Sequence, residues 1–105
     1  MNYNINDVAK EMMIESEDLR EILEMFILEA GKILAQCEEE YVAANADSLA
    51  KHFHALKGSA LNLRINSIGN LAAQLEIESK VGNITNVEVI LPQIKEEVLY
   101  LQDLL

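Results

Sequence analysis

Two histidines, His52 and His54, lie near the middle of the chain in the segment 49–63, which reads LAKHFHALKGSALNL. Neutral imidazole is a nucleophile at physiological pH, because its ordinary pKa is about 6.5. A phosphoryl group on an imidazole nitrogen stays reactive enough to be passed to another acceptor. Such a transfer needs space on the far side of phosphorus and a cation beside its oxygens. Gly58 can provide the space and Lys57 the cation.

The apolar residues of segment 49–63 recur at helical spacing, which predicts a helix with one buried face. At about 100° per residue, His52 lies about 60° from the centre of that face and His54 about 140° from it. His52 is therefore interpreted as a boundary residue with a hydrogen-bonded ring, whereas His54 faces water. The predicted buried face consists of Leu49, Phe53, Leu56, Ala60 and Leu63.

Gly58 is unusual because a glycine inside a helix costs about 1 kcal/mol relative to alanine. Close packing of two helices would explain it, but Gly58 is expected to lie opposite the core. A glycine on the exposed face, four residues after His54, suggests that a partner approaches closely there. Ala55 and Leu61 flank the same surface with an apolar rim. The pattern indicates a docking face with a nucleophile in it.

The chain is acidic, with a formal net charge of -10. Such a charge opposes binding to nucleic acid or to an anionic membrane. Residues 48–75 differ from the rest, because they contain no Asp or Glu but include Lys51, Lys57 and Arg64. Local positive charge favours a phosphoryl group and attracts an acidic pocket on a partner.

The apolar period is helical nearly throughout, and 105 residues suffice for one domain, 1–105, with one modest core. Short connections favour an all-α, antiparallel up-down four-helix bundle over about 17–104, with a short extra N-terminal helix. Thr85 and Glu88 form a capping-box pattern for the last helix, and Pro92 predicts a kink there or a start nearer Val89. A short first helix is predicted over 6–13, and a long helix of about 28 residues follows an N-cap at Ser16. Two further helices are predicted over 49–63 and from 66 to about 81.

Several classes of protein are disfavoured. The N-terminus lacks the features of a signal peptide, and no run approaches the roughly 20 apolar residues of a membrane span. The single Cys37 excludes an internal disulfide, leaves too few thiols for a zinc site and is interpreted as a small core residue. No Glu-x-x-His pair or glycine-rich phosphate loop is present, so neither a metal nor a cofactor is expected in this chain.

The segment His54-Ala55-Leu56-Lys57-Gly58-Ser59-Ala60 resembles the H-x-L-K-G-S signature of histidine-containing phosphotransfer (HPt) domains. Residues 71–76, LAAQLE, resemble the L-A-x-x-L-E that follows at the same distance in that family, and 19–34 resembles its long second helix. The resemblance implies a four-helix bundle with an extra N-terminal helix. His54 would accept a phosphoryl group from an aspartate of one receiver domain and deliver it to another.

The same resemblance implies roles for three further residues. Lys57 would contact the phosphoryl oxygens, and Gly58 would give clearance to the docking receiver. Glu76 matches the glutamate that orients the phosphorylated ring in the similar domain of chemotaxis kinases. By its own position, Glu76 is interpreted instead as a solvated acid on a helix face.

Arg64 stands where the family often has a glycine that eases a left-handed turn. We therefore expect the turn to differ here and to pivot on Asn62 or Asn66. The arginine also adds positive charge near the site. The predicted docking residues are Ala55, Leu61, Asn62 and Arg64.

The preferred interpretation is a cytoplasmic phosphohistidine carrier in a two-component multistep phosphorelay. Its partners would be response-regulator receiver domains and a sensor histidine kinase, and any magnesium would belong to the receiver. The chain would not be an enzyme in its own right. The alternative is a non-catalytic helical module that binds a receiver or kinase without accepting phosphate. A stand-alone enzyme with a phosphohistidine intermediate is disfavoured, because no second base or phosphate cradle is visible.

Overall fold

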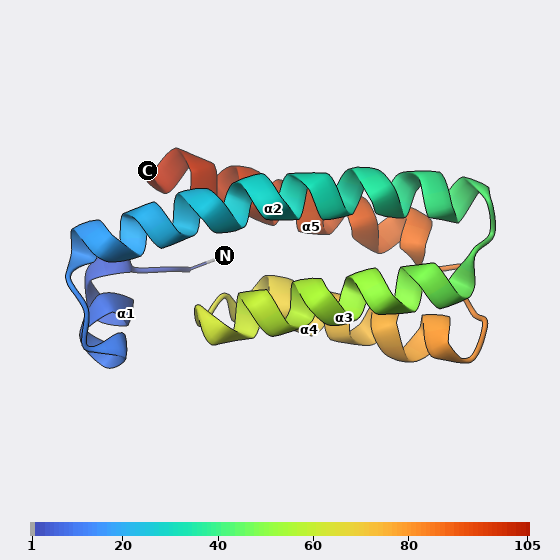
Figure 1. Cartoon of the computed structure of the whole chain (residues 1–105), viewed down its shortest axis with the longest axis horizontal. Helices are drawn as coiled ribbons and strands as arrows, with labels where there is room; N and C mark the ends of the chain where they lie inside the picture. The colour runs from blue at the N-terminus through green and yellow to red at the C-terminus, as the bar shows by residue number, and fades with distance from the viewer. Residues whose placement is uncertain (1) are drawn as a thin grey trace.

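The structure, a computed structural model, describes residues 2–105, and this part of the chain folds into five helices joined by short turns (Figure 1). The four long helices run alternately up and down, and each packs against two neighbours in the cyclic order α2–α3–α4–α5. The shortest helix, α1, folds against α2 at one end of the bundle. The predicted all-α bundle with an extra N-terminal helix is confirmed. The helices are α1 (Ile5–Met12), α2 (Ser16–Val42), α3 (Ala46–Asn62), α4 (Asn66–Lys80) and α5 (Val87–Leu104).

The core lies along the bundle axis, where each long helix contributes an apolar stripe. The predicted inner face of α3 is confirmed, since all five of its residues are buried. Cys37 is also fully buried on the α2 stripe, as expected for a small core residue. The hydroxyl of Tyr3 donates a hydrogen bond of 2.8 Å to the carbonyl of Leu63, which ties the N-terminal segment to the end of α3. Within residues 2–105, no helix is long and apolar enough to cross a membrane.

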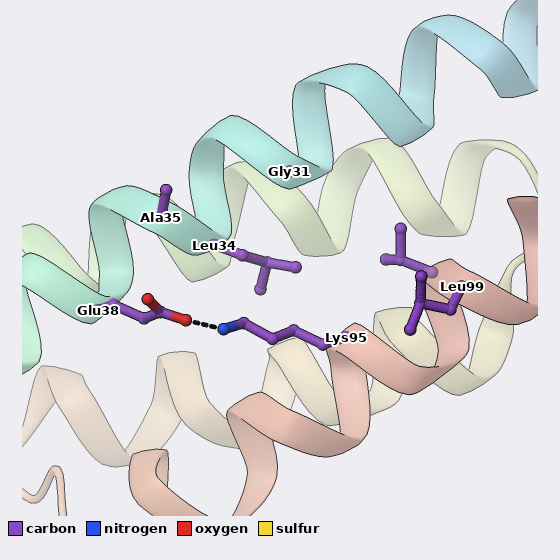
Figure 2. Close-up of a pocket in the computed structure, with 7 residues that line it drawn as sticks. Gly31, Leu34, Ala35, Glu38, Lys95 and Leu99 are labelled. Atoms are coloured by element: carbon purple, nitrogen blue, oxygen red, sulfur yellow. Dashed lines mark ion pairs between the residues drawn. The ribbon is translucent and has the colours of Figure 1, made fainter.

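The outer side of the α2–α5 pair carries a shallow groove (Figure 2). An ion pair between Lys95 of α5 and Glu38 of α2 spans it. Gly31 lies on α2 in this groove, and a Cβ added to it would meet no atom within 4 Å. Gly31 is therefore not required for packing, which makes it a useful reference for the other helical glycines.

The turn between α3 and α4 pivots on Arg64, which has a positive φ of 58°. Its main-chain N–H donates to the carbonyl of Leu61 at 3.0 Å and so caps the end of α3. The expected pivot on Asn62 or Asn66 is therefore wrong. Arg64 itself adopts the left-handed conformation, which costs a non-glycine residue about 1–2 kcal/mol. The arginine also adds a positive charge to the turn.

Two helices begin differently from the sequence-based expectation. Ser16 is the first residue of α2 and not its N-cap, because its hydroxyl donates to Asn6 Oδ1 at 2.8 Å; Glu15 holds the N-cap position. Helix α3 starts at Ala46, three residues early, because the side chain of Asn45 accepts a hydrogen bond from the N–H of Ser48.

The start of α5 also differs, because the predicted capping box does not form. The Thr85 hydroxyl donates to Asn83 Oδ1 at 2.8 Å, so it belongs to the preceding turn. Helix α5 begins at Val87, two residues before the predicted Val89. Pro92 is then its sixth residue, where the missing N–H leaves one main-chain hydrogen bond unmade near the start of the helix.

Candidate functional site

His54 lies in the middle of α3, and 68 % of its side chain is exposed to solvent. The exposure predicted from the helical period is confirmed. The face beside it is open, because a Cβ added to Gly58 would meet no atom within 4 Å. Gly58 therefore has no packing role within residues 2–105, and a partner can approach the His54 ring over it.

The neighbouring helix α4 places Glu76 directly against the His54 ring. Its Oε2 atom lies 2.7 Å from His54 Nδ1, yet only 2 % of the Glu76 side chain is exposed. Lys57 Nζ lies 2.6 Å from Oε1, and Lys80 Nζ lies 3.2 Å from Oε2. The interpretation of Glu76 as a solvated acid is therefore wrong. Three partners compensate the cost of burying this carboxylate.

These contacts set the charge of Glu76. The hydrogen bond from Lys57, with those from His54 and Lys80, outweighs the opposing effect of burial and lowers the pKa of Glu76 to about 2. The carboxylate is therefore ionised at neutral pH. An ionised carboxylate can only accept hydrogen bonds. In the neutral His54 ring, Nδ1 must then carry the hydrogen, which leaves the lone pair on Nε2.

This arrangement suits nucleophilic attack by Nε2. Positive charge develops on an imidazole ring when one nitrogen forms a new bond, and a carboxylate at the other nitrogen stabilises that charge. Glu76 is in place to do so and also fixes the orientation of the ring. The buried carboxylate of Glu76 therefore favours the His54 tautomer with its hydrogen on Nδ1. It also favours the positively charged ring that forms when Nε2 attacks.

A hollow of about 250 Å³ lies beside the ring. Its lining includes Lys51 and Lys80, so two positively charged residues border it. Sequence reasoning missed Lys80. The available signal was its position four residues after Glu76, which places the two side chains on one helix face. The hollow is lined by Ala50, Lys51, His54, Glu76 and Lys80.

The predicted docking residues lie on the outer surface of α3 and in the turn after it. Ala55, Asn62 and Arg64 are exposed. Leu61 is 41 % exposed, and its remainder packs against α4, where a Cβ on Gly69 would lie 2.4 Å from Leu61 Cδ2. Leu61 is thus shared between the helix interface and the surface. The docking role of all four stays a prediction.

The second histidine, His52, faces α2. Its Nδ1 atom lies 2.7 Å from Oε1 of Glu40, and 28 % of its side chain is exposed. The expected boundary position with a hydrogen-bonded ring is confirmed. His52 and His54 therefore have different carboxylate partners on different helices.

The lowered pKa of Glu76 makes stability depend on pH. Its value in the folded protein is about 2, against an ordinary 4.5. A carboxyl group whose pKa is lower in the folded than in the unfolded protein stabilises the fold at pH values above its unfolded-state pKa. This stabilisation is lost as the pH falls to the folded-state pKa. We expect the unfolding free energy of the wild type to exceed that of Glu76→Gln most above about pH 5, with the gap closing toward about pH 2. Urea denaturation of both proteins across this range measures the gap; a constant difference would contradict the assignment.

Comparison with known protein families gives a match over most of the chain. The sequence model of a protein family described as the Hpt domain matches residues 21–104, which include the four long helices from the second turn of α2 onward. No curated protein and no solved structure matches the chain.

Proposed function

We propose that this chain, which belongs to the Hpt domain family, is a phosphohistidine carrier in a multistep phosphorelay. Members of that family carry phosphoryl groups between two-component signalling proteins, and His54 would be the acceptor here. One observation carries the assignment to His54: its Nδ1 is held by an ionised, buried carboxylate while its Nε2 is free on an open surface. The proposed partners are receiver domains and a sensor histidine kinase. The cytoplasmic location expected from the sequence remains part of this proposal.

The transfer follows from the tautomer. Nε2 of His54 attacks the phosphorus of an aspartyl phosphate on a receiver; the N–P bond forms, the P–O bond breaks, and the receiver regains its carboxylate. Nδ1 keeps its hydrogen, and Glu76 balances the positive charge of the ring. Attack by an aspartate of a second receiver reverses these steps. Any magnesium ion would come with the receiver.

The lysines that contact Glu76 have a second use in this proposal. Lys57 is 29 % exposed and Lys80 63 % exposed, so both ammonium groups border the surface where the phosphoryl group would arrive. While neither bond to phosphorus is complete, the charge of the phosphoryl group is spread over its three equatorial oxygens, where nearby cations can stabilise it. The cations would then act mainly on the transition state.

Replacing Lys57 with Ala should therefore slow transfer by roughly tenfold or more while changing receiver affinity little. Rapid-quench measurement of transfer rates, with receiver affinity measured separately, distinguishes the two effects. Lys10→Ala, an exposed lysine on α1, is the charge-matched control and should leave the rate unchanged. An unaltered rate for Lys57→Ala would limit Lys57 to holding Glu76.

The function is tested by mixing the protein with a receiver that carries a radiolabelled aspartyl phosphate. The proposal predicts that label appears on this chain and is lost in acid but kept in base, as for a phosphoryl group on nitrogen. A chain that binds the receiver yet stays unlabelled would instead be the non-catalytic module.

A further inference from the structure

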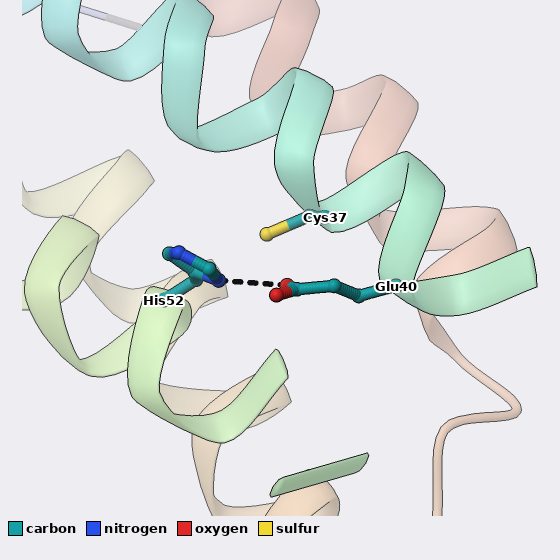
Figure 3. Close-up of side chains that lie close together, drawn as sticks. All are labelled: Cys37, Glu40 and His52. Carbon is teal, nitrogen blue, oxygen red and sulfur yellow. Dashed lines mark hydrogen bonds and ion pairs between the residues drawn. The ribbon is translucent and has the colours of Figure 1, made fainter. Parts of the chain in front are cut away.

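Three metal-ligating side chains meet between α2 and α3, away from the Glu76 cluster: Cys37, Glu40 and His52 (Figure 3). One ligand atom from each lies within 4.8 Å of the other two. Figure 3 shows the Cys37 thiol and the Glu40 carboxylate, both from α2, pointing toward the His52 ring from α3. We propose that these three residues bind one Zn²⁺ ion. The site does not involve His54 and goes beyond the proposed phosphotransfer.

The positions of the ligands follow from the fold. Cys37 and Glu40 are three residues apart on α2 and therefore share a helix face. The short turn after α2 brings α3 back along it, which places His52 opposite that face. The thiol lies on the inner side and is fully buried, whereas the side chains of Glu40 and His52 are 19 % and 28 % exposed. The cluster is thus open to solvent on one side only, where an ion could enter and a water molecule could complete four ligands.

The donor set suits zinc more than the hard cations. Thiolate and imidazole bind Zn²⁺ well, and a carboxylate is a common third ligand, whereas Mg²⁺ and Ca²⁺ prefer oxygen alone. With one Cys37 thiolate and one Glu40 carboxylate, a divalent ion would make the site electrically neutral. The acidic chain, with a net charge of -10, also attracts cations. A single cysteine excludes a zinc site built mainly from cysteines, but it does not exclude one in which a histidine and a glutamate supply the other ligands.

Binding requires small, specified changes. Zn–N and Zn–O bonds of about 2.0–2.2 Å put tetrahedral ligand atoms roughly 3.3 Å apart. His52 Nδ1 and Glu40 Oε1, now 2.7 Å apart, must therefore separate slightly, and the thiol must move in. The ion replaces the thiol proton, which goes to solvent. The ion also takes the place of the hydrogen between His52 Nδ1 and Glu40. The neutral His52 ring then carries its one hydrogen on Nε2.

The test uses the full chain, stripped of metal with a chelator and titrated with Zn²⁺ against a chromophoric competitor. We expect one ion per chain and a raised melting temperature, because the ion joins α2 to α3. Co²⁺ in place of Zn²⁺ should give the near-ultraviolet charge-transfer band of a cobalt–thiolate bond. Cys37→Ala should abolish that band, and Cys37→Ala and His52→Gln should each weaken Zn²⁺ binding at least tenfold, since even outer-shell changes cost about 10–100-fold.

Two matched variants exclude other sites. Glu39→Gln removes an exposed carboxylate adjacent to Glu40, and His54→Gln removes the other histidine; both should bind Zn²⁺ normally. Far-UV circular dichroism verifies folding, and if Cys37→Ala does not fold, the partly exposed His52→Gln decides the matter. The proposal is overturned if the wild type takes up no stoichiometric Zn²⁺. It is also overturned if His52→Gln binds as the wild type does, or if His54→Gln alone loses the ion.

Discussion

Replacing His54 with Gln is expected to abolish phosphoryl acceptance and leave the fold intact. The variant removes the nucleophilic Nε2, and the amide of glutamine cannot form a phosphoramidate by the same route. Substitutions at exposed positions usually change stability within about 0.5 kcal/mol. Glu76 also keeps its contacts with Lys57 and Lys80. Label transfer from a phosphorylated receiver and thermal unfolding, both on the same preparation, measure the two expectations.

His52→Gln is the matched control for this variant. The two histidines lie two residues apart on α3, but His52 contacts Glu40 and not Glu76. The control should accept phosphate at the wild-type rate. A His54→Gln protein that is labelled normally, together with a His52→Gln protein that is not, would move the acceptor to His52.

The second large effect is expected at Gly58, where stability and transfer should change in opposite directions. Nothing lies within 4 Å of an added Cβ, and alanine is favoured over glycine in a helix by about 1 kcal/mol. Gly58→Ala should raise the melting temperature by about 4–8 °C for a domain of this size. Gly58→Gln should also fold, but its side chain would occupy the space through which a receiver is proposed to approach His54. We expect strongly reduced transfer for Gln and an intermediate effect for Ala.

Gly31→Ala separates the two causes. Gly31 is an exposed helical glycine on α2 with the same open surroundings, so the substitution should stabilise the protein equally. It lies on a different helix from His54 and should leave transfer unchanged. Early unfolding of both Gly58 variants would assign Gly58 a packing role, and normal transfer by both would show that no partner approaches over it.

The period of apolar residues was sufficient to predict the bundle, the inner face of α3 and the exposure of His54. It did not reveal the burial of Glu76, although this residue continues a stripe that includes Ala72 and Leu75 on α4. A carboxylate on such a stripe stays buried only if cations reach it. Lys57 comes from α3, so its contact with Glu76 depends on how α3 packs against α4. The apolar period of a single helix does not reveal that packing.

The errors at the helix ends have a similar origin. Thr85 and Ser16 have the residue types of N-caps, but each donates to a nearby asparagine instead. Arg64 adopts a conformation that favours glycine, while the next residue, Ile65, is completely buried. The burial of Ile65 offsets the cost of the left-handed conformation at Arg64. Packing therefore outweighs the preference of this turn for glycine.

The position of the phosphoryl group within the His54 ring tests the central claim most directly. The chain is labelled with ¹⁵N at histidine, phosphorylated by a phosphorylated receiver, and observed by NMR through the coupling between phosphorus and nitrogen. Because Glu76 holds the hydrogen on Nδ1, we expect phosphorus on Nε2 of His54, with Nδ1 still protonated. Phosphorus on Nδ1, phosphorus on His52, or no phosphohistidine at all would contradict the proposed role of the His54–Glu76 pair.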